Sequence, residues 1–191
     1  MSTNEFEDFG QQIADQAEAF LVGLQAISRE EAPGSAVPLL LLEVSQLLLA
    51  GARLGAQQDF EPESEYQPDV GPDPDLDAMR LRLAVQLGDA DTYSHTFEPY
   101  DALDAGTFPS NLSDDLAAIA TDVANGLRHF RTGNVEEALW WWQYSYLASW
   151  GSLAIGVLTA LHSVVAHSRL DNEVDESEQL QAAEAVLGGS S

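Results

Sequence analysis

The sequence predicts an all-α protein, a single-domain helical bundle of about five main helices around a central apolar helix over residues 135–169. Three observations lead to this fold class. Apolar residues recur every three or four positions in several long segments. Prolines and glycines separate those segments. The length of 191 residues suits one domain.

The first two predicted helices cover about 4–28 and 36–56. The first carries one apolar stripe at helical spacing, made of Phe6, Phe9, Ile13, Phe20 and Leu24. An Ala-Pro-Gly-Ser break at 32–35 separates the two helices. The second is apolar on most of its sides because of its runs of leucine, which is typical of a core helix.

Residues 57–74 are predicted to form an acidic, proline-rich loop. They hold four prolines and six carboxylates, and no regular helix passes through prolines at that spacing. Long loops inside compact domains are usually functional or mobile, so we expect this one to be exposed and to attract a basic partner. A third helix over about 75–87 and a short helical piece over 89–100 follow.

Two further helices complete the predicted bundle. The fourth covers 113–133, and its apolar face is made of Leu116, Ile119, Ala120, Val123, Leu127 and Phe130. The fifth covers 135–169. The acidic residues 171–191 are expected to be a disordered tail, so the chain divides into a helical domain over 1–170 and this tail.

The fifth helix has no formal charge from Ala138 to Ser168, a stretch long enough to span a bilayer. Glu43 interrupts the second helix and no basic cluster sets an orientation, so we expect a soluble protein with no membrane contact. The helix is then buried on all sides. Small residues recur along one side and indicate close approach of a neighbouring helix backbone; they are Ser145, Ser149, Ser152, Gly156, Thr159 and Ser163.

The composition is strongly acidic. Asp and Glu number 32 against 7 basic residues, which gives a formal net charge of −25. Such a surface repels phosphate backbones, so direct nucleic-acid binding is not expected, whereas a basic protein partner would be attracted. The chain has no cysteine, which excludes disulfides and thiolate zinc sites. Residues 1–20 lack the features of a signal peptide, and we expect a cytoplasmic protein.

The segment 113–165 resembles an uncharacterised bacterial family, domain of unknown function 5063. The resemblance begins with Ser113-Asp114-Asp115-Leu116, Ile119, Asp122 and Gly126-Leu127. It continues with Glu137-Ala138-Leu139-Trp140, Trp142, Ser145-Tyr146, Trp150-Gly151 and Ala160-Leu161-His162. The chain departs from the pattern at Ser149, where some members have histidine, and at Thr159, where a basic residue is frequent. The resemblance implies a helical fold and no assigned activity.

Asp115, Asp122 and His129 are seven residues apart and lie at one edge of the apolar face of the fourth helix. Two carboxylates and an imidazole could ligate a metal or perform acid–base chemistry. A step of seven residues rises about 10.5 Å, however, so no two of them can share an ion without a partner from another helix. A solvated helix flank is the simpler interpretation, and no metal or cofactor is predicted.

Trp140, Trp141 and Trp142 are consecutive, so they point about 100° apart and cannot share one helix face. Either one of them points outward as an anchor for a ligand or partner, or all three pack between different neighbours. His162 lies inside the apolar stretch. It could be a base, a ligand or a buried hydrogen-bonded group, and the buried structural role is favoured.

These observations leave the biochemical function unassigned. The leading hypothesis is a non-enzymatic, acidic protein-interaction module. The alternative is a small-molecule-binding or metal-dependent enzyme, with a pocket between the helices at 113–133 and 135–169. A cleft that holds Asp115 or Asp122 beside tryptophan or histidine would favour the alternative.

Overall fold

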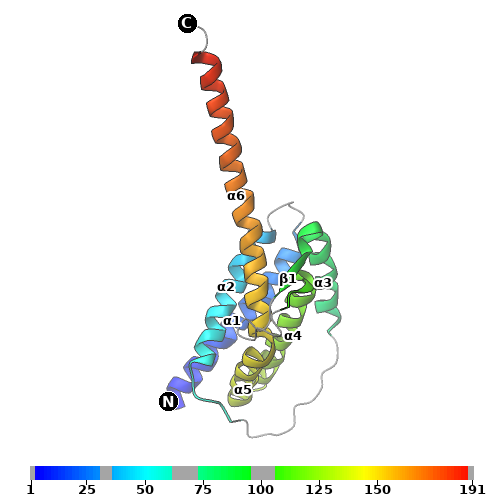
Figure 1. Cartoon of the computed structure of the whole chain (residues 1–191). Coiled ribbons are helices and arrows are strands. Elements are labelled where there is room, and N and C mark those ends of the chain that lie inside the picture. The colour runs from blue at the N-terminus through cyan, green and yellow to red at the C-terminus, as the bar shows by residue number, and fades with distance from the viewer. Residues whose placement is uncertain (1–2, 31–35, 62–72, 96–105, 189–191) are drawn as a thin grey trace.

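The computed structural model describes residues 3–30, 36–61, 73–95 and 106–188. The described chain is a helical bundle with one short hairpin, so the all-α fold class is confirmed (Figure 1). Its helices are α1 (Thr3–Arg29), α2 (Ala36–Gly55), α3 (Pro74–Leu87), α4 (Leu112–Arg131), α5 (Val135–Ser145) and α6 (Gly151–Gly188). The predicted break at 32–35 and most of the predicted loop at 57–74 lie outside the described residues.

α1 and α2 form one side of the bundle. The stripe predicted for α1 faces the core, where Phe9, Ile13, Phe20 and Leu24 are buried. α2 passes through Glu43 without a break, because the carboxylate of Glu43 lies against Gly23 of α1, where there is no side chain. Burial at this contact raises the pKa of Glu43.

α4 occupies the centre of the bundle, since it packs against α1, α3, α5 and α6. Its predicted apolar face is correct, and Leu116, Ile119 and Val123 are buried. A tight turn at Gly133, whose φ is +87°, reverses the chain and lays α5 back along α4. The indole of Trp142 then lies on the backbone of α4 at Gly126, where a Cβ would collide with Nε1 of the ring.

The predicted single helix at 135–169 consists instead of three consecutive pieces. α5 ends at Ser145, a π-helical turn η2 (Tyr146–Trp150) follows, and α6 begins at Gly151. The N–H of Gly151 donates to the carbonyl oxygen of Tyr146, five residues back, which defines the wider turn. The rings of Tyr146 and Trp150 lie 4.8 Å apart and pack against Gly51 of α2, where a β-carbon would leave no room for them.

The sequence had suggested that this helix is buried on all sides. In the structure, the described side chains of α6 are buried on one side only. Ala154, Val157 and Leu161 face the core, while Ile155 and His162 are exposed. The helix also continues to Gly188 instead of ending near Arg169, and its C-terminal part extends away from the bundle (Figure 1). Alanine, glutamate, glutamine and leucine dominate this part, and all four are good helix formers. The division of the chain at residue 170 remains a prediction.

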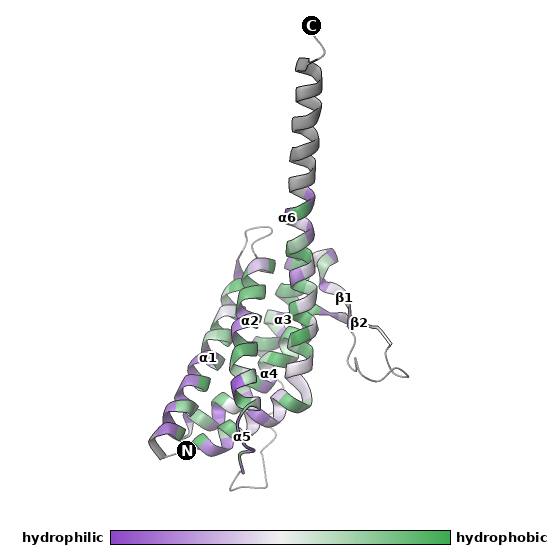
Figure 2. Cartoon of the chain, turned by 60° about the vertical axis from the view of Figure 1, so that its left-hand side comes forward, coloured by the Kyte–Doolittle hydropathy of each residue, from purple (hydrophilic) through white to green (hydrophobic). Residues whose placement is uncertain are grey.

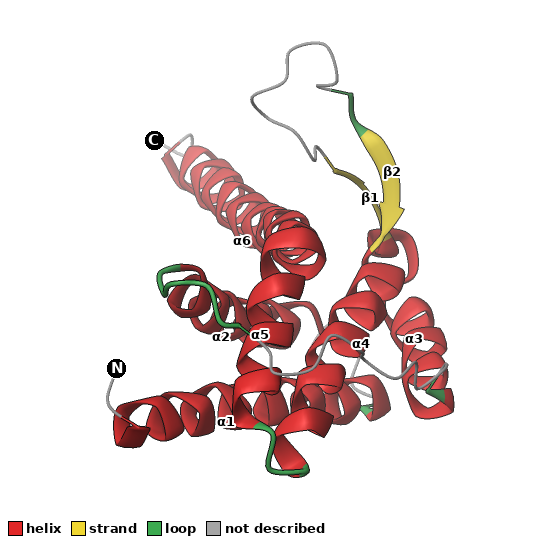
Figure 3. Ribbon diagram, turned by 90° about the horizontal axis from the view of Figure 1, so that it is seen from below, coloured by secondary structure: helices red, strands yellow, loops and turns green. Residues whose placement is uncertain are grey.

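The hairpin was not predicted. A single 3-10 turn, η1 (Gly88–Asp91), follows α3 and leads into β1 (Thr92–His95), which pairs antiparallel with β2 (Phe108–Asn111). The register places Tyr93 opposite Ser110 and Ser94 opposite Pro109. Of the helical piece expected over 89–100, only the 3-10 turn up to Asp91 is observed, and the prediction is wrong for Thr92–His95, which form a strand. Figure 3 shows β1 between β2 and α6.

Two stretches are long and apolar enough to cross a membrane by length and composition alone, Ala36–Gly55 and Val135–Asp171. Each has a third of its most apolar window buried inside the bundle. Figure 2 shows apolar residues along most of α2, where Leu42 and Leu49 are 52% and 66% exposed. α2 therefore carries more apolar side chains than its contacts with α1 and α6 bury. The absence of membrane contact remains a prediction.

The contact of Trp142 with Gly126 gives a first testable prediction. Gly126→Leu should destabilise the fold by about 1–3 kcal/mol or more, because the new side chain must displace an indole in a packed core. The measurement is the free energy of unfolding in urea. Ala118→Leu, at an exposed position of the same helix, is the control and should change little. Equal stability of the two variants would contradict the close packing of α4 and α5.

Candidate functional site

The start of α4 is held by a buried aspartate from η1. Asp91 accepts hydrogen bonds from the backbone N–H of Ser113 at 2.8 Å and from its hydroxyl at 2.9 Å. The side-chain amide of Asn111 donates to the same carboxylate at 3.3 Å. A carboxylate at a helix N-terminus is favoured by the helix dipole and by the unpaired N–H groups there. Asp91 thus fixes the hairpin to the first turn of α4.

Asp115 lies one turn further along α4 and is also buried. It accepts hydrogen bonds from the hydroxyls of Tyr93 and Ser110, each at 2.7 Å. These donors face each other across the hairpin, so Asp115 binds both strands. The solvated-flank interpretation is therefore wrong for Asp115. Its burial depends on the hairpin, which the sequence analysis did not predict.

The phenol of Tyr93 is kept neutral by this arrangement. Burial and the hydrogen bond to the Asp115 carboxylate raise the pKa of Tyr93 far above its ordinary value. Its hydroxyl lies 3.4 Å from Nδ1 of His95, which is buried on the same face of β1. The hydroxyls of Tyr93 and Ser110 are therefore fixed in position, because both donate to the carboxylate of Asp115. This arrangement is suited to holding the hairpin in place.

The imidazole of His95 lies against Gly156 of α6, and a Cβ at Gly156 would collide with the ring. The small residues of α6 therefore accommodate a side chain, where a neighbouring helix backbone had been expected. Next to this contact, a groove of about 480 Å³ lies between β1 and α6. Its walls include Ala90, the four residues of β1, and Thr159, Ala160 and Ser163 of α6.

Asp122 belongs to a separate environment, between α4 and η2. Burial raises its pKa, while a hydrogen bond with Ser149 acts in the opposite direction. The backbone carbonyl of Asp122 accepts a hydrogen bond from the indole of Trp141 at 2.9 Å. Ser149 stands where some relatives were expected to carry histidine, so this departure affects the one described side chain that bonds Asp122.

The three consecutive tryptophans have three different environments. Trp142 is buried and donates to the carbonyl oxygen of Val123, whereas Trp141 is half-buried. The ring of Trp140 is stacked on Tyr144, with ring centroids 5.4 Å apart and an interplanar angle of 9°. Tyr144 is 56% exposed and Leu147, about one turn further, is 66% exposed. We call Trp140, Tyr144 and Leu147 the Trp140 surface.

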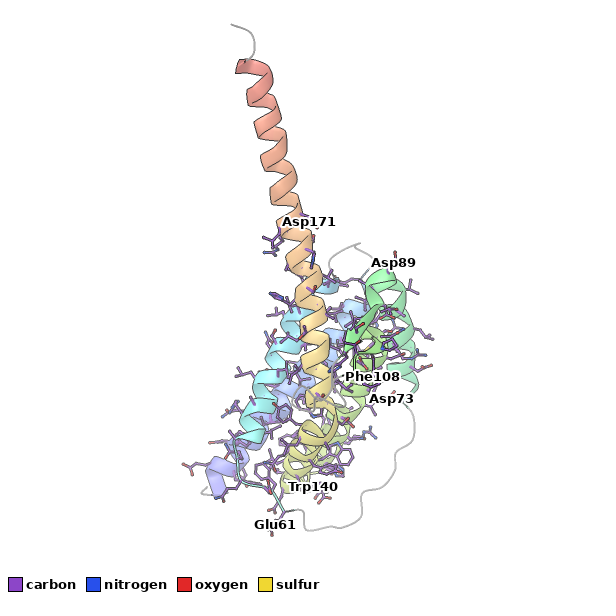
Figure 4. All side chains as sticks on the ribbon, in the orientation of Figure 1. Glu61, Asp73, Asp89, Phe108, Trp140 and Asp171 are labelled. Carbon is purple, nitrogen blue, oxygen red and sulfur yellow. The ribbon has the colours of Figure 1, made fainter. Side chains whose placement is uncertain are left out.

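Gln143 is a residue that the sequence did not single out. Its side chain is buried, donates to the carbonyl oxygens of Leu54 and Gln58, and accepts from the N–H of Phe60 at 3.0 Å. The ring of Phe60 in turn contacts Phe6 and Phe9 of α1. Asp59 and Glu61 are therefore held beside α5, and Figure 4 shows Glu61 and Trp140 at the same end of the molecule.

The candidate residues do not form one site. Asp115 bonds the hairpin, Asp122 bonds Ser149, and His129 is half-buried near the end of α4. His162 is exposed on α6, so its expected burial is wrong; α6 buries one side only. Within the described residues, no group of three or more His, Asp or Glu side chains is placed to hold a metal ion. The structure instead provides the groove and the Trp140 surface.

Gly156→Leu should destabilise the protein by about 1–3 kcal/mol or more, because the His95 ring fills the space that the new side chain needs. Thermal unfolding measures the effect. Ser152→Leu adds the same side chain one turn earlier, at an exposed position of the same stripe, and should be tolerated. A melting temperature that is unchanged by Gly156→Leu would show that His95 does not pack there.

Asp122→Asn should raise the melting temperature at neutral pH. The folded-state pKa of Asp122 is raised by burial, so ionisation opposes folding above that pKa, and this cost disappears as the pH falls through it. The gain should therefore vanish at about pH 3, where the carboxyl is protonated in both states. Asp8→Asn, at an exposed position, controls for the loss of one negative charge. A pH-independent gain would contradict this explanation.

Comparison with solved structures supports the fold. Protein BF1032 from Bacteroides fragilis, known from a crystal structure, is similar with a TM-score of 0.62 and 22% sequence identity. The similarity covers 80% of this chain and 89% of that one. At this identity it shows a shared fold alone. No curated protein matches the chain.

The sequence also matches a family model over nearly the whole bundle. The model is described as a domain of unknown function, DUF5063, and the match covers residues 4–167. It includes α1 to α5 and the part of α6 that packs on the bundle. The resemblance identified from residues 113–165 is thereby confirmed and extended toward the N-terminus. The chain belongs to the DUF5063 family.

Proposed function

We propose that this protein is a non-enzymatic interaction module that works in the cytoplasm, in solution, and binds a basic protein partner at the Trp140 surface. The observation that carries the proposal is an aromatic stack beside carboxylates, in which Trp140 is half-buried and Tyr144 is exposed. Glu136 precedes Trp140 by one helical turn and is exposed. Asp59 and Glu61 are held beside α5 through the bond of Phe60 to Gln143.

Arginine is the side chain that such a surface favours. Aromatic ring faces attract cations, and a guanidinium can also bond a neighbouring carboxylate in a bidentate manner. Tyr144 and Leu147 remain more than half exposed, so binding would remove apolar area from water. Interface hot spots are enriched in tryptophan, tyrosine and arginine, which are the residue types that would meet here.

The overall charge supports the same partner. Two of the chain's own arginines are already engaged in ion pairs, since Arg80 bonds Asp77 and Asp114, and Arg131 bonds Glu18. The net charge of −25 therefore attracts basic proteins over long range and repels nucleic acid. The acidic segment 62–72 lies outside the described residues, but its attachment point at Glu61 is next to α5. Its predicted role in attracting a basic partner fits this location.

The alternative of an enzyme with a pocket between helices 113–133 and 135–169 is less well supported. The indoles of Trp141 and Trp142 lie between α4 and α5 and bond carbonyl oxygens of α4. The groove lies elsewhere, between β1 and α6. Asp115 bonds Tyr93, which lines that groove, but its carboxylate already accepts hydrogen bonds from Tyr93 and Ser110. We therefore favour the interaction module.

A peptide titration tests the proposal. A labelled Gly-Arg-Gly-Arg-Gly peptide should bind at low salt, and the double variant Trp140→Ala with Tyr144→Ala should lose about 1 kcal/mol, roughly fivefold in Kd. The matched control is Leu81→Ala with Val85→Ala, which removes exposed apolar side chains from α3. A lysine version of the peptide should bind more weakly. Equal binding by both double variants would show that attraction is general and not located at the Trp140 surface.

A further inference from the structure

The groove between β1 and α6 has two walls of matched length. β1 contributes all four residues Thr92–His95, and α6 contributes one side of the segment from Ile155 to Val164. Four extended residues span about 13 Å and this ten-residue helical segment about 15 Å, at the usual rises per residue. The groove therefore has the length of a four-residue extended peptide.

The strand wall presents main-chain hydrogen-bonding groups. Within the part of the chain that the structure describes, β1 pairs with β2 alone, and Ser94 is opposite Pro109. Because proline has no N–H, this is a non-hydrogen-bonded pair, and antiparallel alternation gives Thr92 the same character. The N–H and C=O groups of Thr92 and Ser94 therefore point away from β2, on the side where α6 lies (Figure 3).

The helix wall is uncharged in its described part, with small residues between Ile155 at one end and Val164 at the other. Gly156, Thr159, Ala160 and Ser163 leave the space open, and His95 closes one end by packing on Gly156. Among the described residues that line the groove there is no Asp, Glu or Arg. A charged side chain that pointed into the groove would lose hydration without meeting an opposite charge among these described residues. Inward-facing side chains of an occupant are therefore small or apolar.

The surroundings of the groove are acidic. Asp89 is exposed next to Ala90, which lines the groove, and the protein carries a net charge of −25. A second copy of the same chain would be repelled by this charge, whereas a segment with net positive charge would be attracted. Charge complementarity therefore distinguishes a foreign basic segment from self-association.

We propose that the groove binds an extended, net basic peptide segment of a partner protein, which adds as a third strand to the open edge of β1. Main-chain bonds to Thr92 and Ser94 provide the attachment, and the small side of α6 accepts alternate side chains of the segment. The site is separate from the Trp140 surface and does not depend on it.

The test uses the full chain and a fluorescein-labelled hexapeptide, Arg-Val-Thr-Val-Thr-Arg, with two forms N-methylated at alternate backbone amides. Strand addition uses only one set of alternate amides, so one methylated form should lose about tenfold or more in affinity while the other binds like the parent. Measurements on the chain that carries Trp140→Ala and Tyr144→Ala remove any contribution from the Trp140 surface. Equal binding of the two methylated forms, or no binding of the parent, would overturn the proposal.

A pair of groove variants gives a second, independent readout. Thr159→Trp places an indole in the groove from an exposed position of α6, and it should weaken the parent peptide by about tenfold. His162→Trp places the same ring on α6 outside the groove and should leave binding unchanged. Circular dichroism should show the same helicity for both. Equal affinities of these two variants would overturn the assignment of the groove.

Discussion

The indole of Trp142 rests on the backbone of α4 at Gly126 and donates from Nε1 to the carbonyl oxygen of Val123. This contact brings two helices closer than any side chain at Gly126 would allow. It fixes the rotation of α5 about its axis, and with it the direction of every other residue on that helix. Tyr144 then faces solvent with the half-buried Trp140 stacked on it, while Gln143 faces the end of α2, where it bonds three backbone groups.

A second set of contacts positions the hairpin. Asp91 and Asp115 receive their hydrogen bonds from residues of β1, β2 and the first turn of α4. Buried carboxylates are costly unless they are bonded in this way, so the hairpin and the start of α4 stabilise each other. The imidazole of His95 extends the same assembly to Gly156 of α6, which leaves the groove beside it.

The helices could be predicted from the sequence because their signals are local. Apolar patterns, together with the proline and glycine breaks between segments, placed α1, α2, α3 and α4 within a few residues of their observed bounds. The hairpin could not be predicted, since its two strands have four residues each and pair across a long connection. The environments of the site residues could not be predicted for the same reason, because their partners are distant in sequence. Asp115 looks like a surface carboxylate until Tyr93 and Ser110 cover it, and Gln143 gains its role from partners more than 80 residues away in sequence.

The π-helical turn at Tyr146–Trp150 sets the phase between the two halves of what looks in sequence like one helix. Each residue of an α-helix turns the chain by about 100°, so a deletion within this turn that restored regular winding would rotate α6 relative to α5 by roughly that angle. Gly156 would then no longer face His95, and the core side of α6 would turn toward water. The length of this segment is therefore constrained more tightly than its composition. Insertions and deletions should be far less tolerated here than in the connections between the helices.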